Sequence, residues 1–406
     1  MEEYAQKYLD VYSLFLSYLV SSENLPTSNI DFLLKMPNPD KDKYSCLFLD
    51  YSNPMEEMQE AMYQEMLEAE GEDDEEMEMM PPKKEVPEEM LKLRSHCKSL
   101  LQSLWDSILR SPLSSKSTLL ILKNMNTKIF PKISSPIVFS DFIISAYDLA
   151  NTQNSTKKNV ILAIHALSSL FVLMTNHGLD YTSVNFYQKL YLLLGSLKLI
   201  FSMQEKEKFL RLLELSLKSP MLPAAIAASF IKKTLRIILN ENLCQATICI
   251  WAISFVCNVI KKHQVLTKMI NSEVKKQSNR LQRVEERKLK KRDRKARVKS
   301  GQKSDPDSVF TSGFVKRDVF DMAKVDPMKT GAIETCLWEI LPFLNHNLKI
   351  VRDYASVVCT DFQSKKSLPS EELSKLSEGQ LIASQLSDIS KMKTLRFTEI
   401  ERIDDM

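Results

Sequence analysis

Apolar residues recur every three to four positions along most of this chain, rather than in strict alternation with polar ones. This spacing is typical of helices that bury one face. Only seven glycines occur in 406 residues, so helices have few built-in interruptions. We therefore predict an all-α protein. The predicted helices cover residues 3–22, 91–109, 117–125, 138–149, 158–175, 186–195, 205–217, 223–239 and 243–262, with a further candidate at 371–389.

The lengths of these helices and their short polar or Pro-bearing connections suit an antiparallel helical array. No strict sequence period is visible, so we expect an irregular HEAT-like helical-repeat solenoid. We divide the chain into an N-terminal helical region (1–55), an acidic flexible linker (56–90), a helical-repeat array (91–270), a basic insert (271–312), a C-terminal helical hairpin (313–361) and a tail (362–406).

Charge is distributed unevenly, although the formal net charge is only +3. Between Glu65 and Met79 there are nine acidic residues and no Lys or Arg. Such a segment buries too little apolar surface to offset its ordering entropy, so we expect a flexible linker. It is either a solvated acidic loop or a docking strip for a basic partner.

Residues 271–300 hold 13 Lys or Arg against four acids, a net of 13 − 4 = +9. The segment is predicted to be a projecting helix or disordered. Dense basic charge attracts phosphate through counterion release, and the same pattern serves as a nuclear-import signal. The alternative is a solvated, charge-balanced helix. Aromatic residues are absent, so base stacking is not expected. The candidate RNA-binding or import residues are Arg287, Lys288, Lys290, Lys291, Arg292, Arg294, Lys295, Arg297 and Lys299.

The helix predicted at 223–239 has two chemically different sides. Pro223 suits the first helical position because that position needs no amide donor. One side carries Ala224, Ala227, Ala228, Ile231, Leu235 and Ile238, and its alanines allow a neighbouring helix to approach closely. Lys232, Lys233 and Arg236 share the opposite side. We interpret this basic group either as a solvated face or as a contact for phosphate or an acidic partner.

A helical hairpin is predicted at 331–361. Thr330 is positioned to cap its first helix, and Glu334 lies in the first turn, where the helix dipole favours an anion. Asn345, His346 and Asn347 form the predicted turn. The apolar stripes of the two arms are Ile333, Leu337, Ile340, Leu341 and Leu344, then Ile350, Val351, Tyr354, Ala355, Val357 and Val358.

No reaction class is suggested by the sequence. The five histidines show no metal-ligand spacing, and neither a P-loop, a Gly-rich dinucleotide turn nor a Gly-x-Ser-x-Gly elbow occurs. The seven cysteines form no Cys-x-x-Cys pair and are expected to be small core residues. The most apolar stretch, 243–260, is short for a bilayer span, so we predict a soluble protein. We expect no catalysis, cofactor, metal, membrane or small-molecule substrate.

The order of several segments resembles the CCAAT-binding-factor-like domain of the nucleolar complex proteins. The segments that carry the resemblance are 186–191, 209–215, 222–223, 229–232, 235–236, 318–321, 326–327 and 332–339, with a similar stretch at 104–122. Its structural motif residues are Leu222, Pro223, Phe230, Lys232, Arg236, Asp326, Pro327, Thr330, Leu337, Trp338 and Glu339. The chain departs from the family at Val319, where proline is common, and in the turn at 345–348.

This resemblance implies a non-catalytic nucleolar assembly factor of the small-subunit processome, which acts in 18S rRNA maturation and 40S subunit biogenesis. It implies a helical scaffold with a nucleolar protein partner inside the pre-ribosome. Pre-rRNA contact through the basic insert is our own expectation. Two other functions stay open at this point: a DNA-binding transcription factor, for which no helix-turn-helix, zinc or basic-zipper pattern is present, and a helical nuclear transport receptor.

Overall fold

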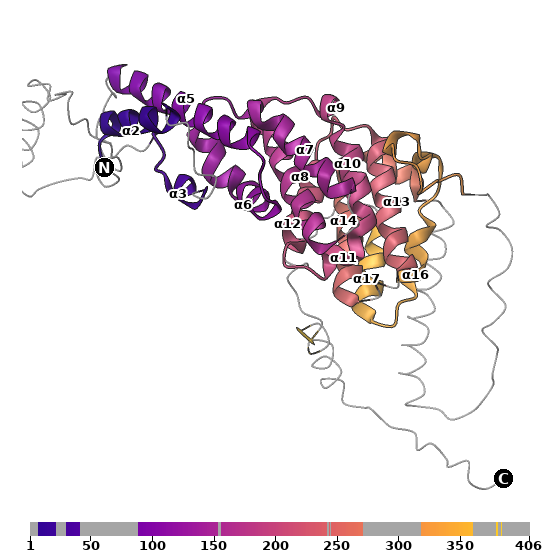
Figure 1. The fold of residues 1–406 in the computed structure, drawn as a ribbon. Helices are drawn as coiled ribbons and strands as arrows, with labels where there is room; N and C mark the ends of the chain where they lie inside the picture. The colour runs from indigo at the N-terminus through magenta and orange to yellow at the C-terminus, as the bar shows by residue number, and fades with distance from the viewer. Residues whose placement is uncertain are drawn as a thin grey trace, which may run out of the picture. The chain divides into compact units, whose positions relative to one another are not determined.

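The computed structural model describes residues 7–21, 30–40, 88–152, 156–241, 243, 245–270, 318–359, 379–380 and 383 (Figure 1). Within these residues the fold is all-helical, with 14 α-helices, short 3-10 segments and one π-helical turn, and no β-strand. The predicted all-α class is therefore confirmed. Glu65 to Met79, the basic residues of 271–300 and most of the predicted helix 371–389 lie outside the described residues.

The chain divides into two compact units, and helix α8 (Lys157–His177) contributes to both. The first unit contains residues 1–152 and 169–180. Its other helices are α2 (Leu9–Ser21), α3 (Ile30–Lys35), α5 (Glu88–Arg110), α6 (Ser115–Asn124) and α7 (Ser140–Thr152). Helix α2 packs along α5. The Lys132 ammonium donates to the backbone carbonyls of Leu34 and Met36, which ties α3 to the 3-10 turn Phe130–Lys132.

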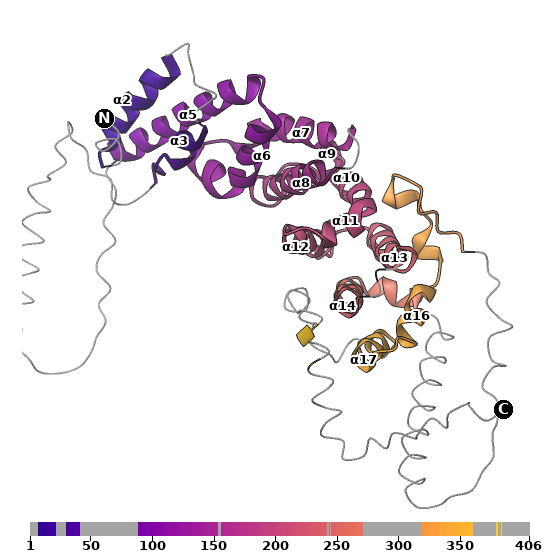
Figure 2. The ribbon, with the colours of Figure 1, turned by 60° about the horizontal axis from the view of Figure 1, so that its bottom comes forward.

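The second unit contains residues 153–168 and 181–406. Besides the first half of α8, its helices are α9 (Tyr181–Val184), α10 (Phe186–Leu193), α11 (Leu197–Phe201), α12 (Lys206–Ser216), α13 (Ala224–Asn240), α14 (Ala246–Lys262), α16 (Leu341–Leu344) and α17 (Lys349–Val358). Helices α13 and α14 pack against each other, and α17 packs on α14 (Figure 2). In α13, 12 of 17 residues are buried, so it is enclosed on nearly every side.

Eight predicted helices between residues 91 and 262 agree with the observed ones to within three residues at each end. Pro223 lies one position earlier than predicted: it is the N-cap of α13, with ψ 129°. The short helices α9 and α11 were not predicted. Among the described cysteines, Cys97, Cys249, Cys257 and Cys359 are buried, as expected of core residues, whereas Cys336 is only half-buried.

The first arm of the predicted hairpin is wrong as a helix. Residues 327–329, 332–334 and 338–340 form separate 3-10 turns before the four-residue α16. Gly331 is left-handed at φ 72°, and the Leu337 amide donates to Met269 O at 2.9 Å instead of to its own segment. Thr330 is buried and does not cap a long helix. The second arm, α17, is a helix as predicted.

Among the described residues, α8 alone has the length and composition of a membrane-crossing helix, and half of its apolar window is buried within the fold. A core helix of a water-soluble protein satisfies the same criteria. The most apolar predicted stretch became α14, with 13 of its 17 residues buried.

Candidate functional site

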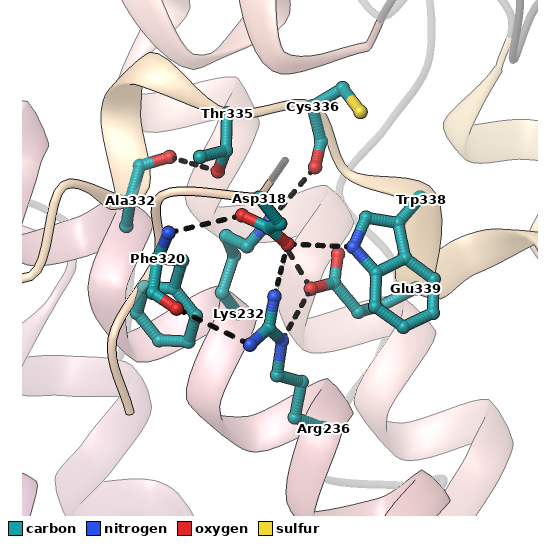
Figure 3. A network of polar contacts seen from close by, with 9 residues as sticks. All are labelled: Lys232, Arg236, Asp318, Phe320, Ala332, Thr335, Cys336, Trp338 and Glu339. Carbon is teal, nitrogen blue, oxygen red and sulfur yellow. Dashed lines mark hydrogen bonds and ion pairs between the residues drawn. The ribbon is translucent and has the colours of Figure 1, made fainter. Parts of the chain in front are cut away.

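The polar residues predicted from the family resemblance meet on one side of α13. There the helix faces residues 318–340, which we name the strap. Five side chains form a connected group, which we name the clasp: Lys232, Arg236, Asp318, Trp338 and Glu339 (Figure 3). Lys232 and Arg236 lie one helical turn apart, so both side chains project from the same face of α13.

Lys232 occupies the inner part of the clasp, with a side chain that is 0% exposed. Its ammonium nitrogen lies 3.2 Å from Asp318 Oδ2 and 3.2 Å from Glu339 Oε1, and donates to Cys336 O at 2.9 Å. It also lies 5.6 Å from the centroid of the Phe320 ring. All four of these neighbours of the Lys232 ammonium belong to the strap.

Arg236 closes the outer part. Its Nε donates to Glu339 Oε1 at 2.8 Å, and its Nη2 pairs with Asp318 Oδ2. The guanidinium carbon lies 4.6 Å from the Phe320 ring centroid and 5.6 Å from that of Trp338. Because the guanidinium is planar and carries several donors, it can bridge both carboxylates and still pack between the two rings.

Asp318 joins both cations to Trp338, whose indole Nε1 donates to Asp318 Oδ2 at 2.8 Å. Burial raises the pKa of the Asp318 carboxyl. The hydrogen bonds from Trp338 and the Phe320 amide lower this pKa, as do the charges of Lys232 and Arg236, and their combined effect is larger than that of burial. The net pKa therefore lies below its ordinary value of 3.8. The carboxylate is held in its charged form.

Two cations face two anions in the clasp, so their formal charges cancel. The interpretation of Lys232, Lys233 and Arg236 as a solvated face is wrong, because both lysines are buried and the Arg236 side chain is only 18% exposed. The acidic partners of Lys232 and Arg236 belong to the same chain. Glu339 is 0% exposed, and its Oε2 atom accepts no hydrogen bond within the described part of the chain. A buried cation already bonded in this way has no donors left for an external phosphate.

Lys233 points to a different neighbour. Its ammonium donates to Tyr191 O at 2.7 Å and lies 3.8 Å from the centroid of the Tyr191 ring. Tyr191 lies near the C-terminal end of α10, where carbonyl oxygens lack intrahelical donors and the helix dipole favours a cation. Burial lowers the pKa of Lys233 to about 8. Lys233 thus ties α10 to α13.

A second polar contact fastens the strap at Thr330. The Ser229 hydroxyl donates to Pro327 O at 2.6 Å and lies 2.5 Å from the Thr330 hydroxyl. Asp326 caps the turn below it by accepting from the Met328 amide at 3.0 Å. The remaining motif residues pack or cap: Leu222, Phe230 and Leu337 are buried, and Pro223 is the N-cap of α13.

Asp318 was not among the predicted motif residues, although it belongs to segment 318–321, one of the segments that carry the family resemblance. It contacts three clasp members: Lys232, Arg236 and Trp338. The predicted residues Arg287 to Lys299 lie outside the described residues, so their RNA-binding or import role stays a prediction. No group of three His, Cys, Asp or Glu that could hold a metal occurs in the described ranges.

Residues 163–355, which include the whole clasp, match the CBF/Mak21 family. The chain is 29% identical to Protein NUCLEOLAR COMPLEX ASSOCIATED 4 of Arabidopsis thaliana over 63% of this chain and 39% of that protein. It is 28% identical to Nucleolar complex protein 4 of Saccharomyces cerevisiae over 78% of this chain and 51% of that protein. It is 26% identical to the Nucleolar complex protein 4 homolog of Mus musculus over 66% of this chain and 41% of that protein.

The fold and the clasp define an all-helical protein in which charged residues of a central helix hold a later segment of the same chain. Residues 163–355 of the chain form a domain of the CBF/Mak21 family. Its distant homologues include NUCLEOLAR COMPLEX ASSOCIATED 4 of a plant and proteins named nucleolar complex protein 4 in a yeast and a mouse. The chain spans between 39% and 51% of the length of the three relatives described above.

Proposed function

We propose that this chain is a nucleolar factor in ribosome biogenesis, which acts in the small-subunit processome during 18S rRNA maturation and 40S subunit assembly. The observation that carries the proposal is the match, over 63% to 78% of this chain, to NUCLEOLAR COMPLEX ASSOCIATED 4 of a plant and to nucleolar complex protein 4 of a yeast and a mouse. Because the match covers about half or less of each relative, the partners of those proteins are proposed here for this chain only as a class: a nucleolar protein within the pre-ribosome.

The role we propose is that of a non-catalytic scaffold. The helices from α9 to α14 follow one another through short connections, α13 packs against α14, and α17 packs on α14. This order suits a HEAT-like solenoid, in which each helix pair contacts the next. In the clasp, the charges neutralise one another and hold the backbone, which suits support of a surface rather than turnover of a substrate.

The basic insert is proposed to add affinity for pre-rRNA, or to direct nuclear import. Lys232 is enclosed by the strap, so phosphate contacts are assigned to the insert rather than to α13. Thirteen basic residues give strong, sequence-independent attraction to a phosphate backbone. Binding of this kind weakens steeply as salt concentration rises, which separates it from binding that reads bases.

The test is affinity purification of the tagged chain from growing cells, with identification of the associated RNA and proteins. Recovery of small-subunit precursor rRNA and processome proteins would support the proposal. Recovery of large-subunit precursors would support a role in ribosome biogenesis but would assign the chain to the large-subunit pathway. A footprint on a defined DNA duplex that survives raised salt would favour a transcription factor instead. Import carriers or nucleoporins without rRNA would favour a transport receptor.

Deletion of residues 271–300 tests the insert separately. We expect the deleted chain to retain its protein partner and to lose salt-sensitive RNA binding, nuclear entry, or both. Fusion to an unrelated import signal distinguishes these results, because it restores entry but not RNA affinity. The matched control deletes residues 65–79, which carry nine acids. Unchanged RNA binding and unchanged import after the 271–300 deletion would reject both roles.

A further inference from the structure

Residues 318–359, which we name the docked segment, lie on helices that precede them by many residues. The described chain stops at Ile270, after the 3-10 turn Gln264–Met269, and resumes at Asp318. The interval 271–317 contains 317 − 270 = 47 residues. Residues on the two sides of this interval are hydrogen-bonded, because the Leu337 amide donates to Met269 O at 2.9 Å.

The docked segment buries an apolar face against α13 and α14. In α17, Val351 and Ala355 are 0% exposed and Val358 is 1% exposed, and this helix packs on α14. The strap adds buried side chains at Phe320, Leu337 and Ile340, and α16 adds Phe343 and Leu344. Such a set of buried apolar groups resembles the core of a stable protein–protein interface.

The clasp supplies orientation to the same interface. Asp318 and Glu339 come from the docked segment, while Lys232 and Arg236 come from α13. Removal of the segment would leave the two cations without these acids, and Lys232 is fully buried when docked. Charge pairs of this kind disfavour incorrect registers, since a shifted strap would place a buried charge against an apolar neighbour.

We infer that α13 and α14 form a binding site for residues 318–359 that does not depend on the covalent connection through 271–317. The occupant is a segment of this chain, held by the apolar face, the clasp and the Leu337–Met269 backbone bond. A chain cut within 271–317 therefore stays assembled as two pieces. This inference rests on the contacts alone and is independent of the proposed cellular role.

The experiment places a specific protease site after Gly301 of the full-length chain. After digestion, a denaturing gel reports cleavage and size-exclusion chromatography under native conditions reports assembly. We expect the two pieces to elute together at the position of the uncut chain. Complete cleavage with separation of the pieces would overturn the inference. Co-expression of residues 1–301 and 302–406 as two chains, one of them tagged, gives an independent measurement with the same two outcomes.

Two substitutions decide whether the clasp holds the pieces. Glu339→Lys places a third cation beside Lys232 and Arg236, so we expect the cut pieces to associate roughly 100-fold more weakly or worse. The matched control is Lys329→Glu, also a charge reversal in the strap but at a side chain that is 78% exposed. Its pieces should remain together. Equal retention by the cut Glu339→Lys chain would contradict a role for the clasp in docking.

Discussion

The ammonium of Lys232 lies 3.2 Å from a carboxylate oxygen of Glu339, and both side chains are 0% exposed although 107 positions separate them in sequence, 339 − 232. Desolvation of two charges is costly, and their mutual attraction offsets it only when other polar contacts complete the site. Arg236, Asp318 and the Cys336 carbonyl provide those contacts. The pair is thus stable only as a member of the clasp.

Replacement of one member of the pair is predicted to destabilise the second unit strongly. Glu339→Gln keeps the shape of the side chain but leaves two cations facing Asp318 alone, and Lys232→Met leaves Glu339 with Arg236 only. We expect each to lower the free energy of unfolding by about 3–5 kcal/mol, measured by urea denaturation. The double variant should lose less than the sum of the single losses, because the remaining partner is no longer charged.

The control for this cycle is Lys329→Met, in a strap side chain that is 78% exposed and pairs with Asp326 at 3.5 Å. Exposed ion pairs contribute little, so its effect should stay within about 0.5 kcal/mol. If Lys329→Met and Lys232→Met cost the same, burial of the clasp would not be the source of its strength.

Trp338 contributes both a ring and a hydrogen-bond donor, and these can be separated. Trp338→Phe keeps an aromatic ring near Arg236 but removes the indole N–H that donates to Asp318 Oδ2 at 2.8 Å. We expect a loss of about 1–2 kcal/mol in the free energy of unfolding, since the acceptor is charged and only partly buried. In an Asp318→Asn background the same change should cost much less; an unchanged cost would show that the donor does not act through Asp318.

Asp318 predicts acid sensitivity with a definite sign. Its pKa in the folded chain lies below the ordinary 3.8, so folding favours the carboxylate. The resulting stability is fully present above the unfolded-state pKa and is lost as pH falls through the folded pKa. The difference in unfolding free energy between the native chain and Asp318→Asn should be constant above about pH 5 and shrink below pH ~4. A difference that stays flat down to pH 2 would contradict the prediction.

Helical spacing was sufficient to place α10, α12, α13 and α14, because each buries apolar residues that repeat with the helical period. The strap could not be placed in this way. Its backbone is set by contacts with distant residues, such as the Leu337 amide bonded to Met269 O and Thr330 beside Ser229. A pattern of local residues carries no information about such partners.

The motif at Lys232, Arg236, Trp338 and Glu339 identified four of the five clasp side chains. The sequence left open whether the α13 cations form a solvated face or contact phosphate or an acidic partner, because charged residues seldom lie fully inside a fold. The neutralising acids belong to a segment 82 to 107 positions later. Local patterns of residues do not reveal which side chains pair over that distance.

Lys233 predicts an alkaline rise in stability. Burial lowers its pKa from 10.5 to about 8, so between these pH values the unfolded chain binds more protons than the folded chain. Stability therefore increases as pH rises through this interval. From pH 7 to 9.5, before ordinary tyrosines ionise, the native chain should gain unfolding free energy relative to Lys233→Met. Lys262→Met, at an exposed position of α14, is the control. Parallel curves for the native chain and Lys233→Met would reject the prediction.

Gly331 is predicted to be the backbone position on which the strap depends. Its φ is +72°, which L-residues disfavour, while a Cβ there would meet Val319 Cγ1 only at an ordinary 3.4 Å. The loss of stability on substitution of Gly331 should therefore come from the backbone conformation rather than from a steric clash. Gly331→Ala should lose about 1–2 kcal/mol of unfolding free energy, and Gly331→Asn less, since asparagine tolerates the left-handed region.

Hydrogen exchange of the strap amides provides the local readout for these variants, because loss of the turn should expose residues that dock on α13. Gly178 is the matched control: its φ is +73° and no atom lies within 4 Å of an added Cβ. Gly178→Ala incurs the same conformational cost in the other unit, so it should lower stability without faster exchange in the strap. Faster strap exchange in both variants would mean that the strap responds to overall stability, and Gly331 would have no special place in holding it.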